Sequence, residues 1–264
     1  MLGRATIIAA IGSLLLAVPS LAEVSYVGSS TLGENVIPEA SQAFTAQTGI
    51  RFGAIEIQGS GQGLDKVVKG EAELAGVSRN LSRSEKREPI YWEIVGYDAV
   101  AVFVHPTNTV AALTKEQLKQ IYTGRVRSWK AVGGRDARIV LITQVWGAKR
   151  AQMIEFRDHV MDGAPYREDR TEVDRQPDQI AALLKEPHGI TTVSLAFSRP
   201  GLKLVAIEGF AAEREHVRSG AYILSRPLLL VTKAHPRPEV KQFMEFMLSA
   251  EGQAIVARKF VPIH

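Results

Sequence analysis

The chain of 264 residues contains no cysteine. Disulfide bonds, a cysteine nucleophile and metal sites with thiolate ligands are therefore excluded. The stability of the protein must come from a hydrophobic core, which a chain of this length can build because the buried fraction of the surface grows with size.

The sequence also lacks a strong excess of either charge. It has 32 Lys and Arg residues against 28 Asp and Glu residues, a formal net charge of +4. This excess is small and dispersed along the chain, so composition gives no support to a nucleic-acid-binding function.

Patterns typical of catalysis or metal binding are missing as well. The six histidines are scattered, with no H-x-H or H-E-x-x-H spacing. Ser60 lies in "GSGQG", which is not the G-x-S-x-G of a hydrolase nucleophile. We therefore expect a protein that is not an enzyme and that carries no cofactor and no metal.

Only one apolar run approaches the length of a membrane span, and it lies at the N terminus. Arg4 precedes "ATIIAAIGSLLLAV", and Ser20 and Ala22 fit a cleavage site for small residues. The run is short for a span, so we predict a secretory signal over residues 1–22, with an uncleaved anchor as the alternative. Loss of Arg4 lowers the formal net charge only to about +3.

The remaining residues alternate between strand-like and helix-like segments. This alternation predicts an α/β fold with mostly parallel sheets, and no long linker separates its parts. The apolar, β-branched run 97–106 is the best candidate for a strand that crosses between two lobes. We expect strands over 24–30, 48–59, 72–79, 97–106, 137–143, 189–197, 202–207 and 226–233, and helices over 33–47, 63–70, 115–124, from about 149, 177–186 and from about 238.

Three segments place small or hydroxyl residues just after a predicted strand. They are "GSSTLGEN" (28–35), "QGSGQGLDKV" (58–67) and "GVSRN" (76–80). Each has a simpler explanation, namely a helix cap, a glycine-rich turn and a surface arginine. Together they describe a donor-rich pocket at the carboxyl ends of strands, which suits a small anion. Arg79 in the third segment could bind an oxyanion in a bidentate manner.

Longer stretches resemble the periplasmic phosphate-binding proteins of ABC transporters, within the type II periplasmic binding-protein superfamily. The most specific is "LTKEQLKQIYTGRVRSWKAVGG", followed by "SRPLLLVTK" with "SAEGQAIV". Further matches are "VGSSTLGENVIPEASQAF", "QGSGQGLDKVVKGEAELAGVSRNLS" and "HGITTVSLAF". They run in order over nearly the whole chain after residue 22.

The resemblance implies two α/β lobes that close over a ligand, each built on a mixed, mostly parallel sheet flanked by helices. One lobe would hold 23–98 with about 208–264, and the other about 99–207. It further implies a monomeric periplasmic protein that binds phosphate or a similar small anion and serves an ABC transporter permease, with no nucleic-acid partner. By motif position the ligand-binding residues would be Ser30, Thr31, Leu32, Ser60 and Ser78, followed by Arg79.

At Ser78 some members of the family have Asp and others Ser. Asp accepts a proton from HPO₄²⁻, whereas Ser can donate or accept, so we expect weaker discrimination among similar anions.

The sequence departs from the family where an anion clamp is typically Arg followed by Ser-Gly-Thr. Here the segment is "TQVWGAKR", in which Gly147 is kept, Trp146 replaces Ser and Ala148 replaces Thr. Lys149 or Arg150 could compensate, or both could be solvated helix residues. Trp146 could fill the cleft, or it could offer a flat wall to an organic ligand. The altered clamp motivates a second hypothesis, a sensor or partner-binding protein whose ligand site is changed or lost.

Overall fold

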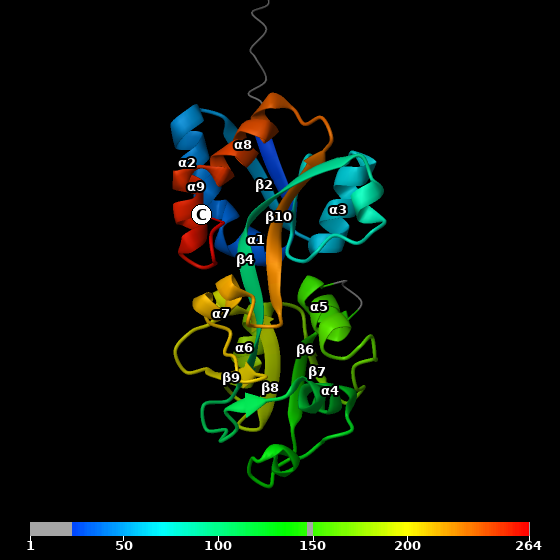
Figure 1. The fold of residues 1–264 in the computed structure, drawn as a ribbon. Coiled ribbons are helices and arrows are strands. Elements are labelled where there is room, and N and C mark those ends of the chain that lie inside the picture. The colour runs from blue at the N-terminus through cyan, green and yellow to red at the C-terminus, as the bar shows by residue number, and fades with distance from the viewer. Residues whose placement is uncertain (1–22, 147–149, 264) are drawn as a thin grey trace, which may run out of the picture.

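The computed structural model of the protein describes residues 23–146 and 150–263. The expected signal at 1–22 lies outside these residues. Figure 1 shows two lobes, one above the other, linked by the long strands β4 (Ile90–Val104) and β10 (Ser225–Lys233). The predicted two-lobed α/β fold is confirmed.

The first lobe surrounds the N-terminal half of β4. Its strands run in the order β2-β1-β3-β10-β4, and β1 pairs in parallel with both of its neighbours. The strands β1 (Glu23–Gly28), β2 (Arg51–Ile57) and β3 (Leu74–Val77) are flanked by the helices α1 (Ser30–Asn35), α2 (Ile37–Thr48), α3 (Ser60–Lys69), α8 (Pro238–Leu248) and α9 (Ala250–Ala257).

The second lobe continues the sheet from the C-terminal half of β4. Its order is β4-β8-β6-β7, in which β6 pairs in parallel with β7 and β8, while β9 pairs with β4 and β5. Its strands are β5 (Ala112–Leu113), β6 (Val140–Gln144), β7 (Thr171–Val173), β8 (Gly189–Ser194) and β9 (Lys203–Ile207). Its helices are α4 (Lys115–Thr123), α5 (Ala151–His159), α6 (Gln176–Leu183) and α7 (Arg214–Ser219).

The apolar run that begins at Tyr97 crosses between the lobes as predicted, but the strand is longer than expected. β4 begins at Ile90, and its first residues mix buried, half-buried and exposed positions, which hides this part of the strand from a search for continuous apolar runs. Its buried half, Ala99–Val104, belongs to the core of the second lobe. The two lobes are therefore joined by regular strands that restrict how they can move relative to each other.

The resemblance places the return of the chain to the first lobe at about residue 208, and the residues that follow bear on this expectation. Ala212, Val217, Tyr222 and Leu224 all pack in the core of the second lobe. Helix α7, which periodicity did not reveal, supplies part of this packing. We therefore propose that the return lies within β10 and not at about residue 208.

Local signals predicted the ends of several helices correctly. Thr114 caps α4, accepting a hydrogen bond from the Gln117 backbone N–H, and Gly124 ends this helix with φ of 84°. Among the described residues, no helix is both long enough and apolar enough to cross a membrane.

Candidate functional site

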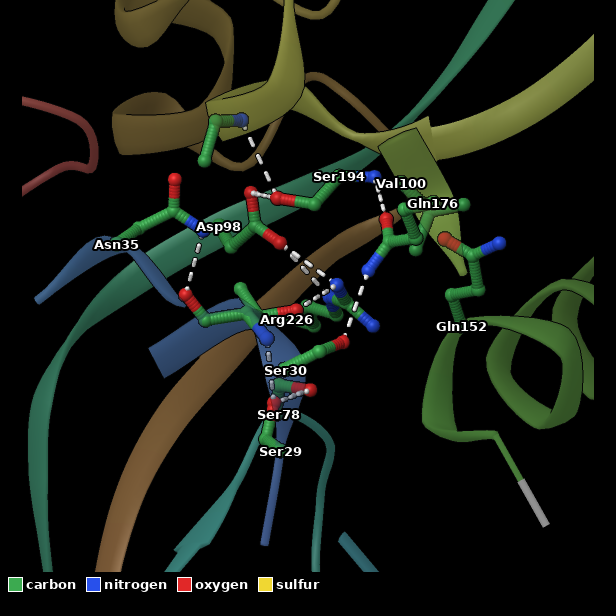
Figure 2. A network of polar contacts seen from close by, with 12 residues as sticks. Ser29, Ser30, Asn35, Ser78, Asp98, Val100, Gln152, Gln176, Ser194 and Arg226 are labelled. Carbon is green, nitrogen blue, oxygen red and sulfur yellow. Dashed lines mark hydrogen bonds and ion pairs between the residues drawn. The ribbon is translucent and has the colours of Figure 1, made fainter. Parts of the chain in front are cut away.

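A small pocket lies where the carboxyl ends of strands from both lobes meet (Figure 2). In the first lobe β1 ends at Gly28, β2 at Ile57 and β3 at Val77, and the pocket residues follow directly. The pocket is lined by Ser29, Ser30, Thr31, Gly59, Ser60, Ser78, Gln144, Arg150, Ala151, Gln152, Gln176 and Arg226.

Two glycines bring the first-lobe segments together. Gly59 precedes α3 with φ of 89°, a conformation that favours glycine. A Cβ on Gly63 would lie 2.7 Å from Gly28 Cα and 2.8 Å from Val27 O. Gly63 therefore lets α3 pack directly on the end of β1, which places Ser60 beside the residues that follow β1 and β3.

Three buried serines form a chain of hydroxyls along one wall. Ser29 Oγ accepts from Thr31 N at 3.1 Å and donates to Ser78 Oγ at 2.9 Å. Ser60 Oγ accepts from Ser78 N at 3.1 Å and lies 3.5 Å from Ser78 Oγ. Ser78 Oγ accepts from Ser29 and Ser60 Oγ accepts from Ser78 N, so at most one of the Ser60 and Ser78 hydrogens is used in the long contact between them, and either can turn to a ligand.

The same arrangement recurs at the start of α1. Ser30 Oγ accepts from Gln176 Nε2 at 3.4 Å, and Thr31 Oγ1 accepts from Arg226 Nη2 at 3.2 Å. Across residues 23–146 and 150–263 neither of these hydroxyls donates to a partner, so the first-lobe wall presents donors to whatever enters the pocket.

Arg226 brings a buried guanidinium to the pocket from the start of β10. Its side chain is 1% exposed, and its Nε and Nη2 donate to Asp98 Oδ2 at 3.0 and 2.7 Å. Asp98 Oδ1 accepts in turn from Ser194 Oγ at 2.9 Å. Nη1 of Arg226 has no partner among the described residues. An unpartnered buried guanidinium nitrogen is costly, and an anion in the pocket would satisfy it.

The second lobe lines the pocket with amides and one further arginine. Gln176 Oε1 accepts from Ser194 N at 2.6 Å, which directs its amide nitrogen toward Ser30. Gln144 donates to Asp174 O at 2.9 Å, and Arg150 Nη2 donates to Asp174 Oδ1 at 2.7 Å. The wall of the second lobe is therefore poor in hydroxyls and rich in side-chain amides.

The pocket thus combines hydroxyl hydrogens, two guanidinium groups and no lining carboxylate among the described residues. A family model described as a PBP superfamily domain matches residues 18–251. The chain belongs to the PBP superfamily.

Individual members of the superfamily agree with this assignment. The chain is 26% identical over 242 residues to the phosphate-binding protein PstS of Borreliella burgdorferi, which covers 87% of this chain and 86% of that protein. A structure from Clostridium perfringens is described as a phosphate ABC transporter substrate-binding protein with bound phosphate. It matches with a TM-score of 0.85 at 28% identity, over 92% of this chain and all of that one. An ABC-type phosphate transport receptor from Vibrio cholerae matches with a TM-score of 0.80 at 21% identity, over 91% of this chain and 100% of that one, which shows a shared fold.

Within this PBP superfamily fold, four of the residues singled out in the sequence line the pocket together: Ser30, Thr31, Ser60 and Ser78. Leu32 does not line it. Its side chain is fully buried in the first-lobe core, so it can contribute to ligand binding only through its backbone.

Arg79 also lies away from the pocket, unlike the bidentate anion contact expected from the sequence. Its Nη1 and Nη2 donate to the two carboxylate oxygens of Glu85 at 2.8 and 2.7 Å. Burial acts to lower the pKa of the Arg79 guanidinium, but its hydrogen bonds to Glu85 outweigh this effect and raise it. Arg79 binds an internal carboxylate and is not available to a ligand in the pocket.

Trp146 neither fills the pocket nor forms its wall. The residue is 37% exposed, its ring packs against Tyr166 with ring centroids 5.6 Å apart, and Arg157 Cζ lies 5.0 Å from the Trp ring centroid. It lines a separate surface cavity with these residues. Gly147 and Lys149, also expected at the site, lie outside the described residues, as does Ala148, whereas Arg150 does line the pocket.

Sequence reasoning missed Arg226, Gln152 and Gln176. A signal existed for Arg226, because an arginine that opens the apolar strand "RPLLLVTK" must find a partner for its charge. The two glutamines carry no comparable signal, since glutamine is common on exposed helix surfaces.

Proposed function

We propose that this member of the PBP superfamily is an exported solute-binding protein that binds phosphate or a related oxyanion for an ABC importer. The observation that supports this most directly is the direction of the hydrogen bonds. Hydroxyl oxygens around the pocket accept bonds from the protein, which leaves their hydrogens, and Nη1 of Arg226, free for an anion.

The balance of charge supports an oxyanion that is held by dipoles as well as by cations. Arg226 is paired with Asp98, and Arg150 is paired with Asp174. Each pair is formally neutral, so these two arginines give the pocket no large net positive charge. Hydrogen bonds to a charged ligand contribute about 1.5–3 kcal/mol each, so several donors together can give tight binding.

The remaining parts of the proposal concern the protein in its cell. We propose that residues 1–22 direct export to the periplasm and that the mature chain acts as a monomer with an ABC permease. The two-lobed fold, with pocket residues on both lobes, supports the role with a permease, because a ligand that touches both lobes favours their closed arrangement. The relatives named above are described as binding proteins or transport receptors, which supports binding without catalysis.

A calorimetric titration of the mature chain with phosphate tests the proposal. We expect saturable binding, and we expect Ser60→Ala to weaken it about 3- to 10-fold through loss of one hydrogen-bond donor. Ser219→Ala serves as the control, because Ser219 is exposed and its hydroxyl, within the described part of the chain, donates only to His216 O in the same helix. If neither phosphate nor another oxyanion binds below about millimolar, the sensor or partner-binding alternative replaces this proposal.

A further inference from the structure

Gln152 has one amide atom satisfied and one left without a partner. Its Nε2 donates to Thr192 O at 2.8 Å and to Gln179 Oε1 at 3.1 Å. A backbone carbonyl can only accept a hydrogen bond, so the contact with Thr192 O identifies the nitrogen of the amide. The orientation of the Gln152 side chain is therefore determined by its surroundings.

A second amide holds this arrangement in place. Gln179 Nε2 donates to Thr191 Oγ1 at 2.8 Å and to Thr192 O at 3.1 Å, so its oxygen must be the atom that faces Gln152. Gln179 is fully buried and Gln152 is 2% exposed. The pair is built into the core of the second lobe and cannot rotate without breaking several bonds.

The oxygen of Gln152 consequently faces the pocket, and no donor of the described residues gives it a hydrogen bond. Gln152 lines the pocket, and its Oε1 has no hydrogen-bond partner among the described residues. In Figure 2 this oxygen points toward Gln176, while the amide nitrogen points away. A buried acceptor without a donor is costly, and the surrounding hydroxyls are directed at an anion in the pocket.

We propose that Gln152 Oε1 accepts the hydroxyl hydrogen of a protonated oxyanion, so that the pocket selects HPO₄²⁻ over anions of the same charge and shape that lack this hydrogen. The inference rests on the proposed function and names the ligand form for the same pocket. A fully deprotonated tetrahedral anion would place one of its oxygens against Gln152 Oε1, where two acceptors repel each other and the amide oxygen stays unsatisfied.

The chemistry differs from selection by a carboxylate. No Asp or Glu lines the pocket among the described residues, so no full negative charge repels the ligand. An amide oxygen carries only a partial charge, and it stays an acceptor at any pH at which the protein is folded. Discrimination by Gln152 should therefore be moderate and should change with pH only through the protonation of the ligand.

The test compares three anions at mildly alkaline pH on the mature chain. Phosphate is then mainly HPO₄²⁻, whereas sulfate and monofluorophosphate are dianions without a hydroxyl hydrogen. We expect the wild-type protein to bind phosphate about 10- to 100-fold more tightly than sulfate or monofluorophosphate. This range is expected when one hydrogen bond is lost and its partner stays buried.

Gln152→Met removes the acceptor at similar volume. We expect this variant to reduce the preference for phosphate to less than about 3-fold, mainly by weakening phosphate binding. Gln144→Met removes another pocket amide and is the matched control, in which the affinities for all three anions should change by a similar factor. Thermal unfolding of each variant shows whether it is folded.

The outcomes separate this inference from the proposed function. If no oxyanion binds to the wild-type protein, the proposed function fails. If phosphate binds but the wild type does not prefer it to monofluorophosphate, the role of Gln152 is refuted, whether or not the variant folds. The same conclusion follows if folded Gln152→Met keeps the wild-type preference, or if Gln144→Met is the variant that loses it.

Discussion

The two walls of the pocket are built from different chemistry. The first lobe contributes hydroxyls at the ends of neighbouring parallel strands, within a few residues of each strand end. The second lobe contributes amides and Arg150, and Gln152 and Gln176 lie on helices well separated from one another in sequence. The first wall therefore follows from local sequence pattern, whereas the second depends on how α5 and α6 pack against β6 and β8.

The largest effect is expected at Arg226, which lies on β10, one of the two strands that join the lobes. Arg226→Met leaves Asp98 buried without its cation, and breaking a buried pair in this way costs about 3–5 kcal/mol. We expect a corresponding loss in the free energy of unfolding, measured by urea denaturation. Phosphate binding should also be lost, because the free Nη1 disappears.

A double variant distinguishes the loss of the Arg226–Asp98 ion pair from the loss of packing around the Arg226 side chain. If the uncompensated charge of Asp98 is the cause, Arg226→Met combined with Asp98→Asn should be more stable than Arg226→Met alone. Equal stability of the single and double variants would show that packing of the Arg226 side chain dominates. Phosphate binding should remain absent in both.

The next effect tests whether the second wall contributes charge to binding. Arg150 is 14% exposed in its side chain and lines the pocket. We expect Arg150→Met to weaken phosphate binding about 10- to 100-fold and to reduce its dependence on salt, as measured by calorimetry at two ionic strengths.

Arg175→Met provides the matched control for charge. Arg175 lies on the same lobe, pairs with half-buried Asp178 and does not line the pocket. An equal loss of affinity in Arg175→Met would mean that binding depends on the total positive charge of the second lobe and not on the position of Arg150. The two walls would then not differ in the charge that they bring to the ligand.

The smallest effect concerns the Arg79–Glu85 pair, which lies behind the first wall. Burial acts to raise the pKa of Glu85, but hydrogen bonds from Arg79 and Ser82 outweigh it and lower this pKa below its usual value. A carboxyl with a lowered folded-state pKa stabilises the protein above its unfolded-state pKa, and this stabilisation is lost as the pH falls below about 4.5.

Glu85→Gln should therefore lower stability by less than about 1 kcal/mol near neutral pH, since the pair is partly open to solvent, and this difference should shrink in acid. Thermal unfolding as a function of pH measures it. Glu88→Gln is the control, because the described residues give Glu88 no ion pair. A difference that persists unchanged in acid would show that the Arg79–Glu85 pair is not its source.

Much of the fold was predictable because its signals are local. Alternation of apolar strands and amphipathic helices gave the α/β class, and turn residues such as Gly124 located helix ends. The failures were equally local in origin. Arg79 follows Ser78 in sequence, but β3 has ended at Val77 and the chain bends at Arg79, so Ser78 lines the pocket while the Arg79 side chain turns to Glu85.

The sequence by itself determined the α/β class and the hydroxyl wall, because strand ends and the residues that follow them are defined by short-range pattern, whereas the two lobes were expected from the family resemblance. Only the tertiary structure decided that Arg226, far in sequence from the serines of the first wall, reaches the pocket and that Trp146 lies outside this pocket. It also decided that the oxygen of Gln152 is left free, because hydrogen-bond partners from β8 and α6 determine that orientation and no spacing in the sequence records them.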